Sequence, residues 1–254
     1  MTRAVTVQSY AKINWSLRIT GKRADGFHDL ETVFQEISLH DTITFRDAER
    51  LSLTCDDPSI PVDESNLVLR AARMAGAETV AIHLQKRIPA GGGLGGGSSN
   101  AAATLVALHG DTSRALELGS DVPFFLVGGT AYATGRGEVL TPLPRMASIP
   151  LLLLLPEERV LTKEAFARIT RYSPPLGIGA YRDFSAFTND FEEPVFAMLP
   201  RLRELKTRLL DAGATWAQMS GSGSTIVGAF ADEAARDAAA AQFADVRTEN
   251  ALTR

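Results

Sequence analysis

The feature that most constrains the fold is a run of glycine in the middle of the chain. Six of the seven positions 91–97 are glycine, and each glycine raises the entropic cost of ordering a loop. A strand-like alternation of Val80, Ile82 and Leu84 precedes the run, and an alanine-rich helical segment at residues 101–108 follows it. A flexible linker is the alternative for such a composition. Linkers join domains, however, whereas this run lies directly between a strand and a helix. The order strand, glycine loop, helix therefore predicts a close backbone approach to a ligand.

The loop has the chemistry to hold phosphate. Amide N–H groups without β-carbons nearby can converge on one point, and the following helix adds the positive end of its dipole. The hydroxyls of Ser98 and Ser99 add donors. The Walker A pattern fails because no lysine stands between the last glycine and Ser98. A dinucleotide-binding glycine pattern starts at Gly91. That pattern requires an acidic residue about 20 positions on, at the end of a second strand, but the nearby Glu117 lies in a helical stretch. The glycine pattern is therefore the only support for an NAD-binding dehydrogenase.

Composition restricts the classes of protein. The chain has 254 residues, 45% hydrophobic and 22% charged, which suits one large or two modest domains. A net charge of -4 provides no field for a nucleic-acid backbone. The single cysteine, Cys55, excludes an internal disulfide and fits a reducing compartment. The most apolar run, residues 149–155, is far shorter than the ~20 residues of a membrane helix, and residues 1–12 contain no signal-peptide core. We expect a cytoplasmic protein with no membrane or nucleic-acid partner.

The periodicity of apolar residues predicts an α+β fold. The first half reads mostly as antiparallel strands, with a hairpin turn at Asp25-Gly26. The predicted strands cover residues 5–7, 11–20, 31–39, 42–45, 51–54, 80–84, 130–134, 149–155, 216–219 and 225–230. One predicted helix has its N-cap at Ser65 and continues to residue 75. A short helix is predicted to end near residue 118. The other predicted helices cover residues 101–108, 122–127, 163–170, 193–199, 201–212 and 232–243.

Several segments resemble signatures of the GHMP kinase superfamily, in the family's order. These are Ala11-Lys12-Ile13-Asn14, the glycine-rich run at residues 89–102, and Met219-Ser220-Gly221-Ser222-Gly223-Ser224-Thr225. Residues 21–28 and 119–125 are similar to the diphosphocytidyl-methylerythritol kinase branch of that superfamily in particular.

The resemblance implies a two-lobed α+β fold, with an N-terminal lobe like ribosomal protein S5 domain 2 and a ferredoxin-like α/β C-terminal lobe. It places an ATP-binding lobe at residues 1–145 and a substrate-binding lobe at residues 146–254, whose last residues can return to the first lobe. The implied reaction transfers the γ-phosphate of ATP, with Mg²⁺, to the 2-hydroxyl of 4-diphosphocytidyl-2-C-methyl-D-erythritol, in isoprenoid precursor synthesis. ATP and this small molecule are the implied partners, and either a monomer or a weak dimer remains open.

The resemblance also assigns two catalytic residues, Lys12 and Asp121. The Asp121 carboxylate is expected to take the proton of the attacking hydroxyl while Lys12 supports the developing charge. By position alone, Asp121 before Val122-Pro123 is typical of a helix cap. Lys12, Asn14 and Ser16 fall on one face of a strand, for which a solvated face is the ordinary interpretation. No protein residue is assigned as a metal ligand.

The binding residues follow from the same resemblance. The residues implied to bind the nucleotide are Asn66, Pro89, Ala90, Gly91, Gly92, Gly93, Leu94, Gly95, Gly96, Gly97, Ser98, Ser99 and Asn100. The residues implied to bind the substrate are Asn14, Phe27, His28, Phe187, Gly221 and Ser222. Phe27 stands where the family is expected to have tyrosine, which keeps a stacking ring and loses a hydroxyl. A core aromatic for Phe187 and a ligand-free helix start for Asn66 remain equal alternatives.

Two points leave the function open at this stage. Only residues 103–119 separate the loop helix from Ser120-Asp121, which is short for the family and puts the spacing of Asp121 in question. The rivals are another GHMP kinase, acting on homoserine, mevalonate, a phosphomevalonate or a sugar, and a non-catalytic nucleotide-binding relative. Gly26-Phe27-His28 favours a cytidine-bearing substrate, and the presence of Lys12 with Asp121 favours catalysis.

Overall fold

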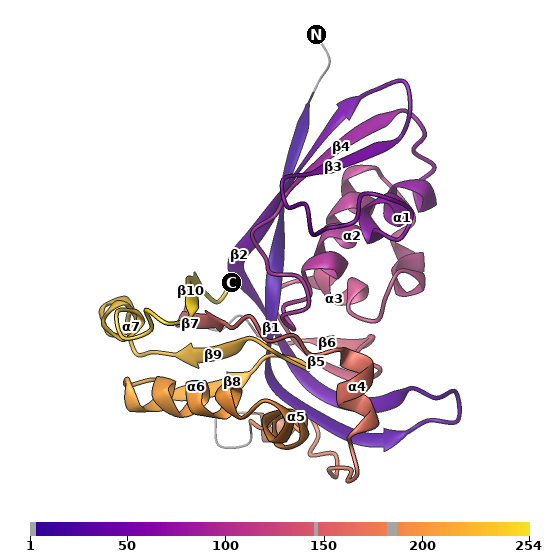
Figure 1. Cartoon of the computed structure of the whole chain (residues 1–254). Coiled ribbons are helices and arrows are strands. Elements are labelled where there is room, and N and C mark those ends of the chain that lie inside the picture. Colours follow the sequence, from indigo (N-terminus) through magenta and orange to yellow (C-terminus); the bar gives the residue numbers. More distant parts are fainter. Residues whose placement is uncertain (1–3, 145–146, 182–186) are drawn as a thin grey trace. The chain divides into compact units, whose positions relative to one another are not determined.

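The computed structural model describes residues 4–144, 147–181 and 187–254. The chain divides into two compact units, each built from helices and strands (Figure 1). Unit 1 comprises the described start of the chain up to Ala11, Leu39–Ala90 and Gly95–Gly128. Unit 2 comprises Lys12–Ser38, Gly91–Leu94 and Gly129–Arg254. The chain passes from one unit to the other inside two long strands and inside the glycine loop. The lobe boundary expected between residues 145 and 146 stays a prediction.

The two longest strands, β1 (Val5–Lys22) and β2 (His28–Asp47), pair with each other and each contributes to both units. The tight reversal between them confirms the predicted turn: Gly26 has a φ of 87°, and the Arg23 N–H donates to the Phe27 carbonyl at 2.8 Å. Each long strand replaces two shorter predicted ones. Polar residues such as Asp41 do not interrupt β2, because the Asp41 carboxylate finds partners inside unit 1.

The sheet of unit 1 uses the second half of β2. Its strand β4 (Val80–Gln85) pairs antiparallel with residues Thr42 to Asp47 of β2. Strand β3 (Ser52–Cys55) pairs with β4 in the parallel direction. The antiparallel arrangement predicted for the first half therefore does not hold at β3, because the helix between β3 and β4 lets these two strands run in the same direction.

Four short helices form an apolar cluster in unit 1, around side chains such as Ala102, Leu105 and Val122. They are α1 (Leu67–Met74), α2 (Gly96–Ala107), η1 (Thr112–Glu117) and α3 (Val122–Val127). The short segment before Ser120 thus contains the end of α2 and one 3₁₀ helix. Since small alanine side chains let the helices approach closely, the shortened connection still packs.

Helix α1 begins one residue later than predicted. Asn66, not Ser65, is its N-cap, and the Asn66 Oδ1 accepts the Val68 N–H at 2.9 Å. Asn66 also donates to the Pro61 carbonyl at 2.6 Å. The Ser65 hydroxyl is instead bonded to the Asp63 carboxylate at 2.6 Å. Both polar groups of the Asn66 side chain therefore have structural partners, which supports the ligand-free alternative for this residue.

Unit 2 contains a sheet of four antiparallel strands in the order β10-β7-β9-β8. The strands are β7 (Pro150–Leu155), β8 (Trp216–Met219), β9 (Ile226–Ala229) and β10 (Arg247–Leu252). The helices are α4 (Thr162–Ala167), η2 (Ile178–Ala180), α5 (Glu192–Met198), α6 (Pro200–Asp211) and α7 (Glu233–Ala240). The apolar faces of α4, α5, α6 and α7 cover a core that includes Leu152, Leu205 and Ile226, each fully buried.

The first half of β2 carries a second set of pairings in unit 2. It pairs antiparallel with β5 (Thr130–Gly135), which pairs with β6 (Val139–Pro142). The sequence did not predict β6 or β10, because both lie at sheet edges, where half-exposed polar residues are tolerated. The chain end returns to β2, where the Arg254 N–H donates to the Glu36 carbonyl at 3.0 Å.

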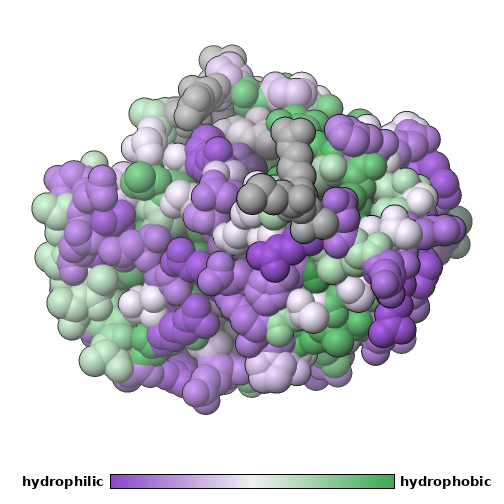
Figure 2. All heavy atoms as spheres, turned by 90° about the horizontal axis from the view of Figure 1, so that it is seen from above, coloured by the Kyte–Doolittle hydropathy of each residue, from purple (hydrophilic) through white to green (hydrophobic). Residues whose placement is uncertain are grey.

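Hydrophilic side chains cover much of the face shown in Figure 2, with smaller hydrophobic areas among them. Of the helices in the described residues, none combines the length and apolar character that crossing a bilayer requires.

Candidate active site

Strand β1 places Lys12 and Asn14 on one face, as the alternation predicted, but that face is buried. The two residues are 3% and 1% exposed, so the solvated-face interpretation is wrong. The Lys12 Nζ donates to the Asn14 Oδ1 at 2.7 Å, and the Asn14 Nδ2 donates to the Thr32 Oγ1 at 2.8 Å. The Thr32 hydroxyl in turn donates to the Ser16 carbonyl at 2.6 Å. This chain of contacts fixes the ammonium group of Lys12, and Thr32 is a member that sequence reasoning missed.

The first half of the glycine loop lies against the carboxyl-terminal glycine-rich turn within unit 2. The Lys12 N–H donates to the Leu94 carbonyl at 3.0 Å, and the Ser220 hydroxyl donates to the Gly93 carbonyl at 3.0 Å. A β-carbon on Gly93 would lie 2.0 Å from the Ser220 carbonyl oxygen. Backbone meets backbone here, so position 93 requires glycine. Three sequence segments far apart in the chain thus meet in one place.

The turn itself is held next to the lysine. A β-carbon on Gly221, whose φ is 56°, would lie 3.4 Å from the Lys12 Nζ. The buried Asn189 side chain donates to the carbonyls of Met219 and Gly221 at 2.7 and 2.8 Å. Asn189 is a second residue that the sequence did not single out. In the sequence Asn189 stands two residues after Phe187, and no local pattern predicts its contact with a turn 30 residues later.

The second half of the loop belongs to unit 1, where it opens helix α2. The helix starts at Gly96, not at Ala101 as predicted, with Gly95 (φ 69°) as its N-cap. No side chain caps this end, so the amides of the first turn are not consumed by a capping residue. This arrangement, with Ser98 half-buried in the first turn, is the kind that accepts an anion.

Two of the predicted nucleotide-binding residues form hydrogen bonds within unit 1. Ser99 and Asn100 are 3% and 2% exposed. The Ser9 hydroxyl lies 2.7 Å from the Ser99 Oγ and donates to the Asn100 Oδ1 at 2.7 Å. Both side chains therefore tie α2 to the start of β1, and the Ser99 N–H already donates to the Gly95 carbonyl at 2.9 Å.

Asp121 stands at the start of α3 in unit 1. It occupies the N-cap position, but its side chain makes no capping hydrogen bond, so capping does not explain the carboxylate. A β-carbon on Gly119 would lie 3.9 Å from the Ser98 Oγ. The segment that carries Asp121 therefore lies beside the first turn of α2, in spite of the short connection between them.

A buried ion pair supports the entry to the loop in unit 1. The Lys86 Nζ donates to the Asp41 Oδ2 at 2.6 Å, with side chains 6% and 0% exposed. The other Asp41 oxygen accepts the Arg87 and Ile88 N–H groups at 2.7 and 2.8 Å. A β-carbon on Gly96 would lie 3.1 Å from the Lys86 Nζ. The pair therefore fixes the end of β4 next to the start of α2.

Replacing Lys86 with methionine is expected to lower the free energy of unfolding by about 3–5 kcal/mol, because it leaves the Asp41 carboxylate buried and unpaired. Urea unfolding of wild type and variant measures this loss. The matched control is Arg73→Met, which breaks the exposed Arg73–Glu64 pair, with side chains 57% and 61% exposed, and leaves stability nearly unchanged. Equal losses in the two variants would contradict the role given to the buried pair.

Phe27 and His28 follow the β1–β2 turn in unit 2. The Phe27 side chain is 50% exposed, and the Arg136 guanidinium carbon lies 4.4 Å from its ring centroid. The His28 ring stacks on Phe166, with centroids 4.7 Å apart and planes at 15°. Burial, and then the charge of Lys22, lowers the pKa of His28 below 6.5. At neutral pH the imidazole therefore offers one donor and one acceptor.

Phe187 and Ser222 both contact other side chains of unit 2. The Phe187 ring lies 6.1 Å from the Trp15 ring and 5.9 Å from the Tyr181 ring, between centroids, and the side chain is half-buried. The Ser222 Oγ lies 3.0 Å from the Thr162 Oγ1. Phe187 therefore belongs to an aromatic cluster and keeps part of its surface accessible.

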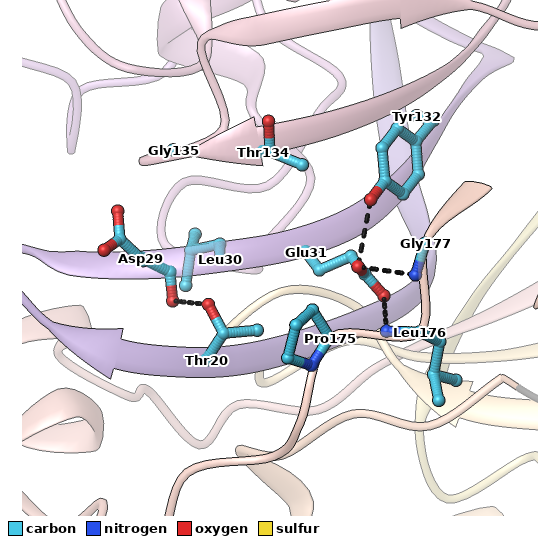
Figure 3. Close-up of a pocket in the computed structure, with 10 residues that line it drawn as sticks. All are labelled: Thr20, Asp29, Leu30, Glu31, Tyr132, Thr134, Gly135, Pro175, Leu176 and Gly177. Atoms are coloured by element: carbon cyan, nitrogen blue, oxygen red, sulfur yellow. Dashed lines mark hydrogen bonds between the residues drawn. The ribbon is translucent and has the colours of Figure 1, made fainter.

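A pocket of about 520 Å³ opens in unit 2 between β1, β2, β5 and the segment before η2 (Figure 3). Glu31, only 2% exposed, lies in the wall of this pocket. Its carboxylate accepts the Tyr132 hydroxyl at 2.9 Å, the Tyr181 hydroxyl at 2.5 Å, and the N–H groups of Leu176 and Gly177 at 2.9 and 3.0 Å. Sequence reasoning gave no role to this site.

The hydrogen bonds keep Glu31 ionised. Burial alone would raise the pKa of the Glu31 carboxyl, but the donors of Tyr181, Leu176, Gly177 and Tyr132 together hold it below its ordinary value. Burial, reinforced by the hydrogen bond to this carboxylate, raises the pKa of Tyr132 to about 12. The same causes raise the pKa of Tyr181. Both phenols therefore stay protonated and act as donors.

Comparisons with known proteins agree with this arrangement. Residues 66–129 match the family described as GHMP kinases N terminal domain, and residues 176–246 match GHMP kinases C terminal. A 4-diphosphocytidyl-2-C-methyl-D-erythritol kinase from Chlorobium phaeobacteroides (strain BS1) is 43% identical, covering 92% of this chain and 91% of the relative. One from Pelodictyon phaeoclathratiforme is 40% identical, covering 89% of each.

Solved structures agree on the fold. A crystal structure of 4-(cytidine 5'-diphospho)-2C-methyl-D-erythritol kinase matches with a TM-score of 0.87 and 34% identity, over 98% of this chain and 99% of the other. The Methanococcus jannaschii mevalonate kinase matches with a TM-score of 0.72 at 14% identity, over 99% of each chain, and so shares the fold. Membership of a kinase family implies the use of ATP. The chain belongs to the GHMP kinases, within the family of 4-diphosphocytidyl-2-C-methyl-D-erythritol kinases.

Proposed function

We propose that this protein transfers the γ-phosphate of ATP to the 2-hydroxyl of 4-diphosphocytidyl-2-C-methyl-D-erythritol. The observation that carries the proposal is the contact between Gly93 and Ser220 beside Lys12, which joins the three glycine-rich or lysine-bearing segments in unit 2. Relatives at about 40% identity bear the name of this activity. Nothing in the described residues calls for a covalent enzyme intermediate.

We assign the triphosphate to the backbone amides of the glycine loop and of the first turn of α2. In the described part of the chain, no three His, Cys, Asp or Glu side chains cluster so as to hold a metal ion. Mg²⁺ keeps several waters and binds through phosphates and one or two protein oxygens, so it would arrive with the nucleotide. The Ser98 hydroxyl is the protein oxygen ligand we propose. Bound there, Mg²⁺ would neutralise charge on the phosphates.

We assign proton transfer to Asp121 and charge stabilisation to Lys12. The Asp121 carboxylate accepts the proton of the 2-hydroxyl as its oxygen bonds to the γ-phosphorus, and the bond to the bridging oxygen of ADP breaks. The buried Lys12 ammonium, oriented by Asn14, offsets negative charge on the transferring phosphoryl group. Phosphoryl transfer requires mainly alignment and charge neutralisation, and these groups supply both.

We assign the cytidine end of the substrate to Phe27, His28 and Phe187. The half-exposed Phe27 ring offers a stacking surface. The neutral imidazole of His28 has one donor and one acceptor, which suits hydrogen bonding to a pyrimidine edge. A sugar, homoserine or mevalonate gives these three side chains nothing to bind, which separates this proposal from the other GHMP activities.

A panel of acceptors tests the proposal. Purified protein with MgATP is expected to release ADP rapidly with 4-diphosphocytidyl-2-C-methyl-D-erythritol, and at background rate with homoserine, mevalonate or galactose. CMP is expected to compete with the acceptor, and UMP to compete less, because uracil has an O4 acceptor and an N3–H donor where cytosine has an N4 amino donor and an N3 acceptor. Faster turnover of any other acceptor would assign the chain to a different activity, and ATP binding without turnover of any acceptor would indicate a non-catalytic relative.

A further inference from the structure

We propose that Glu31 is a positioning residue for the cytidine end of the substrate. Its carboxylate fixes a strap, defined as residues 174–181, and through Tyr181 of that strap it holds the ring of Phe187. The inference deepens the proposed function and rests on it, because Phe187 was assigned there to the cytidine base. The effect predicted for Glu31 is on recognition of the cytidine-bearing substrate, not on phosphoryl transfer.

The carboxylate is built into the strap by its hydrogen bonds. One oxygen, Oε1, accepts the Leu176 N–H and the Tyr181 hydroxyl, and the other, Oε2, accepts the Gly177 N–H and the Tyr132 hydroxyl (Figure 3 shows Glu31, Tyr132, Leu176 and Gly177). Three of these four donors come from the strap, and Tyr132 comes from β5. A buried carboxylate is costly without such partners, so burying Glu31 and placing the strap are linked.

Apart from a hydrogen bond of the Tyr181 hydroxyl with the Ser16 side chain, the strap has few other restraints in the described part of the chain. Its largest aliphatic side chains, Leu176 and Ile178, are each 44% exposed, so apolar burial contributes little there. The Arg18 Nε donates to the Pro174 carbonyl at 3.2 Å in an exposed contact. The bonds to the buried Glu31 carboxylate are therefore the strongest restraint on the strap, since hydrogen bonds to a charged group are stronger than neutral ones.

The strap passes its position on to Phe187. The Tyr181 ring lies 5.9 Å from the Phe187 ring and 5.9 Å from the Tyr132 ring, between centroids. With its hydroxyl bonded to Glu31, Tyr181 cannot turn without losing that bond. Loss of the carboxylate is therefore expected to loosen one wall against which Phe187 packs.

The geometry requires a carboxylate and not an amide. Each oxygen of Glu31 faces two donors. Glutamine has the same shape, but its NH₂ group would face two of these donors and accept neither. Glu31→Gln is therefore a near-isosteric change that removes the restraint without removing the side chain.

Steady-state kinetics of Glu31→Gln test the inference. The variant is expected to raise the KM for 4-diphosphocytidyl-2-C-methyl-D-erythritol about tenfold, the usual scale for losing hydrogen bonds to a charged group. Its KM for ATP and its kcat are expected to stay within about twofold of wild type, because the contacts of Lys12 and the glycine loop are untouched. A purely structural role would lower the melting temperature and the active fraction and leave both KM values unchanged.

Two tyrosine variants form a matched pair. Tyr181→Phe and Tyr132→Phe each remove one hydroxyl donor from the same carboxylate and keep the ring, and Tyr181→Phe also removes a hydrogen bond with the Ser16 side chain. Only Tyr181 lies on the strap, so Tyr181→Phe is expected to raise the KM for the cytidine-bearing substrate several-fold and Tyr132→Phe to leave it near wild type. This pair decides the question even if Glu31→Gln does not fold.

The outcomes separate the inference from the proposed function. Absence of turnover of this substrate by wild type overturns the proposed function. Turnover by wild type with an unchanged KM in Glu31→Gln overturns the inference alone. An equal rise of KM in both tyrosine variants also overturns it, because the strap would then have no special part.

Discussion

Replacing Asp121 with asparagine is expected to lower kcat by about 100- to 10,000-fold, the range that a positioned general base contributes. The KM for ATP is expected to stay near wild type, because the backbone amides of the glycine loop are unaffected. Stability is also expected to hold, since asparagine is nearly isosteric with aspartate and is a favoured N-cap. Single-turnover kinetics with the purified variant, alongside an unfolding curve, measure both quantities.

Asp111→Asn is the matched control for that experiment. Asp111 is also the N-cap of a short helix in unit 1, η1, where it accepts the Ser113 N–H at 3.0 Å. Asparagine retains an oxygen for this bond, so kcat and stability are both expected to remain near wild type. Full activity in Asp121→Asn would remove Asp121 from the mechanism, and a comparable loss in Asp111→Asn would show that a change of helix cap, not of base, was being measured.

Replacing Gly93 with alanine is expected to abolish nucleotide binding, with affinity for an MgATP analogue reduced at least about 100-fold. The new β-carbon would lie 2.0 Å from the Ser220 carbonyl oxygen and 2.9 Å from its carbon. Both are backbone atoms that no rotamer change can move, so the loop and the turn must separate. Separation would shift the loop amides together with the Leu94 carbonyl that receives the Lys12 N–H.

Gly91→Ala isolates this clash from backbone strain. Gly91 and Gly93 have almost the same φ, 74° and 75°, but a β-carbon on Gly91 meets nothing within 4 Å. Both variants therefore bear the cost of a left-handed alanine, about 1–2 kcal/mol, and only Gly93→Ala adds the clash. Calorimetric titration with a non-hydrolysable analogue is expected to show binding by Gly91→Ala within about tenfold of wild type. Equal affinities for the two variants would contradict the close packing.

Local patterns predicted most of the elements. The Asp25-Gly26 turn, the strand Trp216–Met219 and the helix Val122–Val127 all lie where their sequences place them. Errors arose where tertiary contacts override propensity. The start of α2 was expected at Ala101 because glycine is a poor helix former, yet a β-carbon on Gly96 would lie 2.9 Å from the Ile88 side chain. Packing, not propensity, therefore selects glycine in that turn.

The candidate site was predictable where a motif carries it. Lys12, the glycine loop and the Ser220 turn could be found from the sequence, and alternation placed Lys12 and Asn14 on one face. Alternation does not say which face is buried, so the solvated interpretation failed. Glu31 was missed because its partners Tyr132 and Tyr181 lie 101 and 150 residues away. Its only local signal was a glutamate in an apolar strand.

The identity of the reaction product is the most direct test of the central claim. Wild-type protein, MgATP and 4-diphosphocytidyl-2-C-methyl-D-erythritol can be followed by ³¹P NMR. We predict that one phosphomonoester resonance grows for each ADP formed, while the diphosphate resonances of the acceptor persist. A chain that consumes ATP without forming that monoester, or that forms none with fully folded protein, would contradict the account.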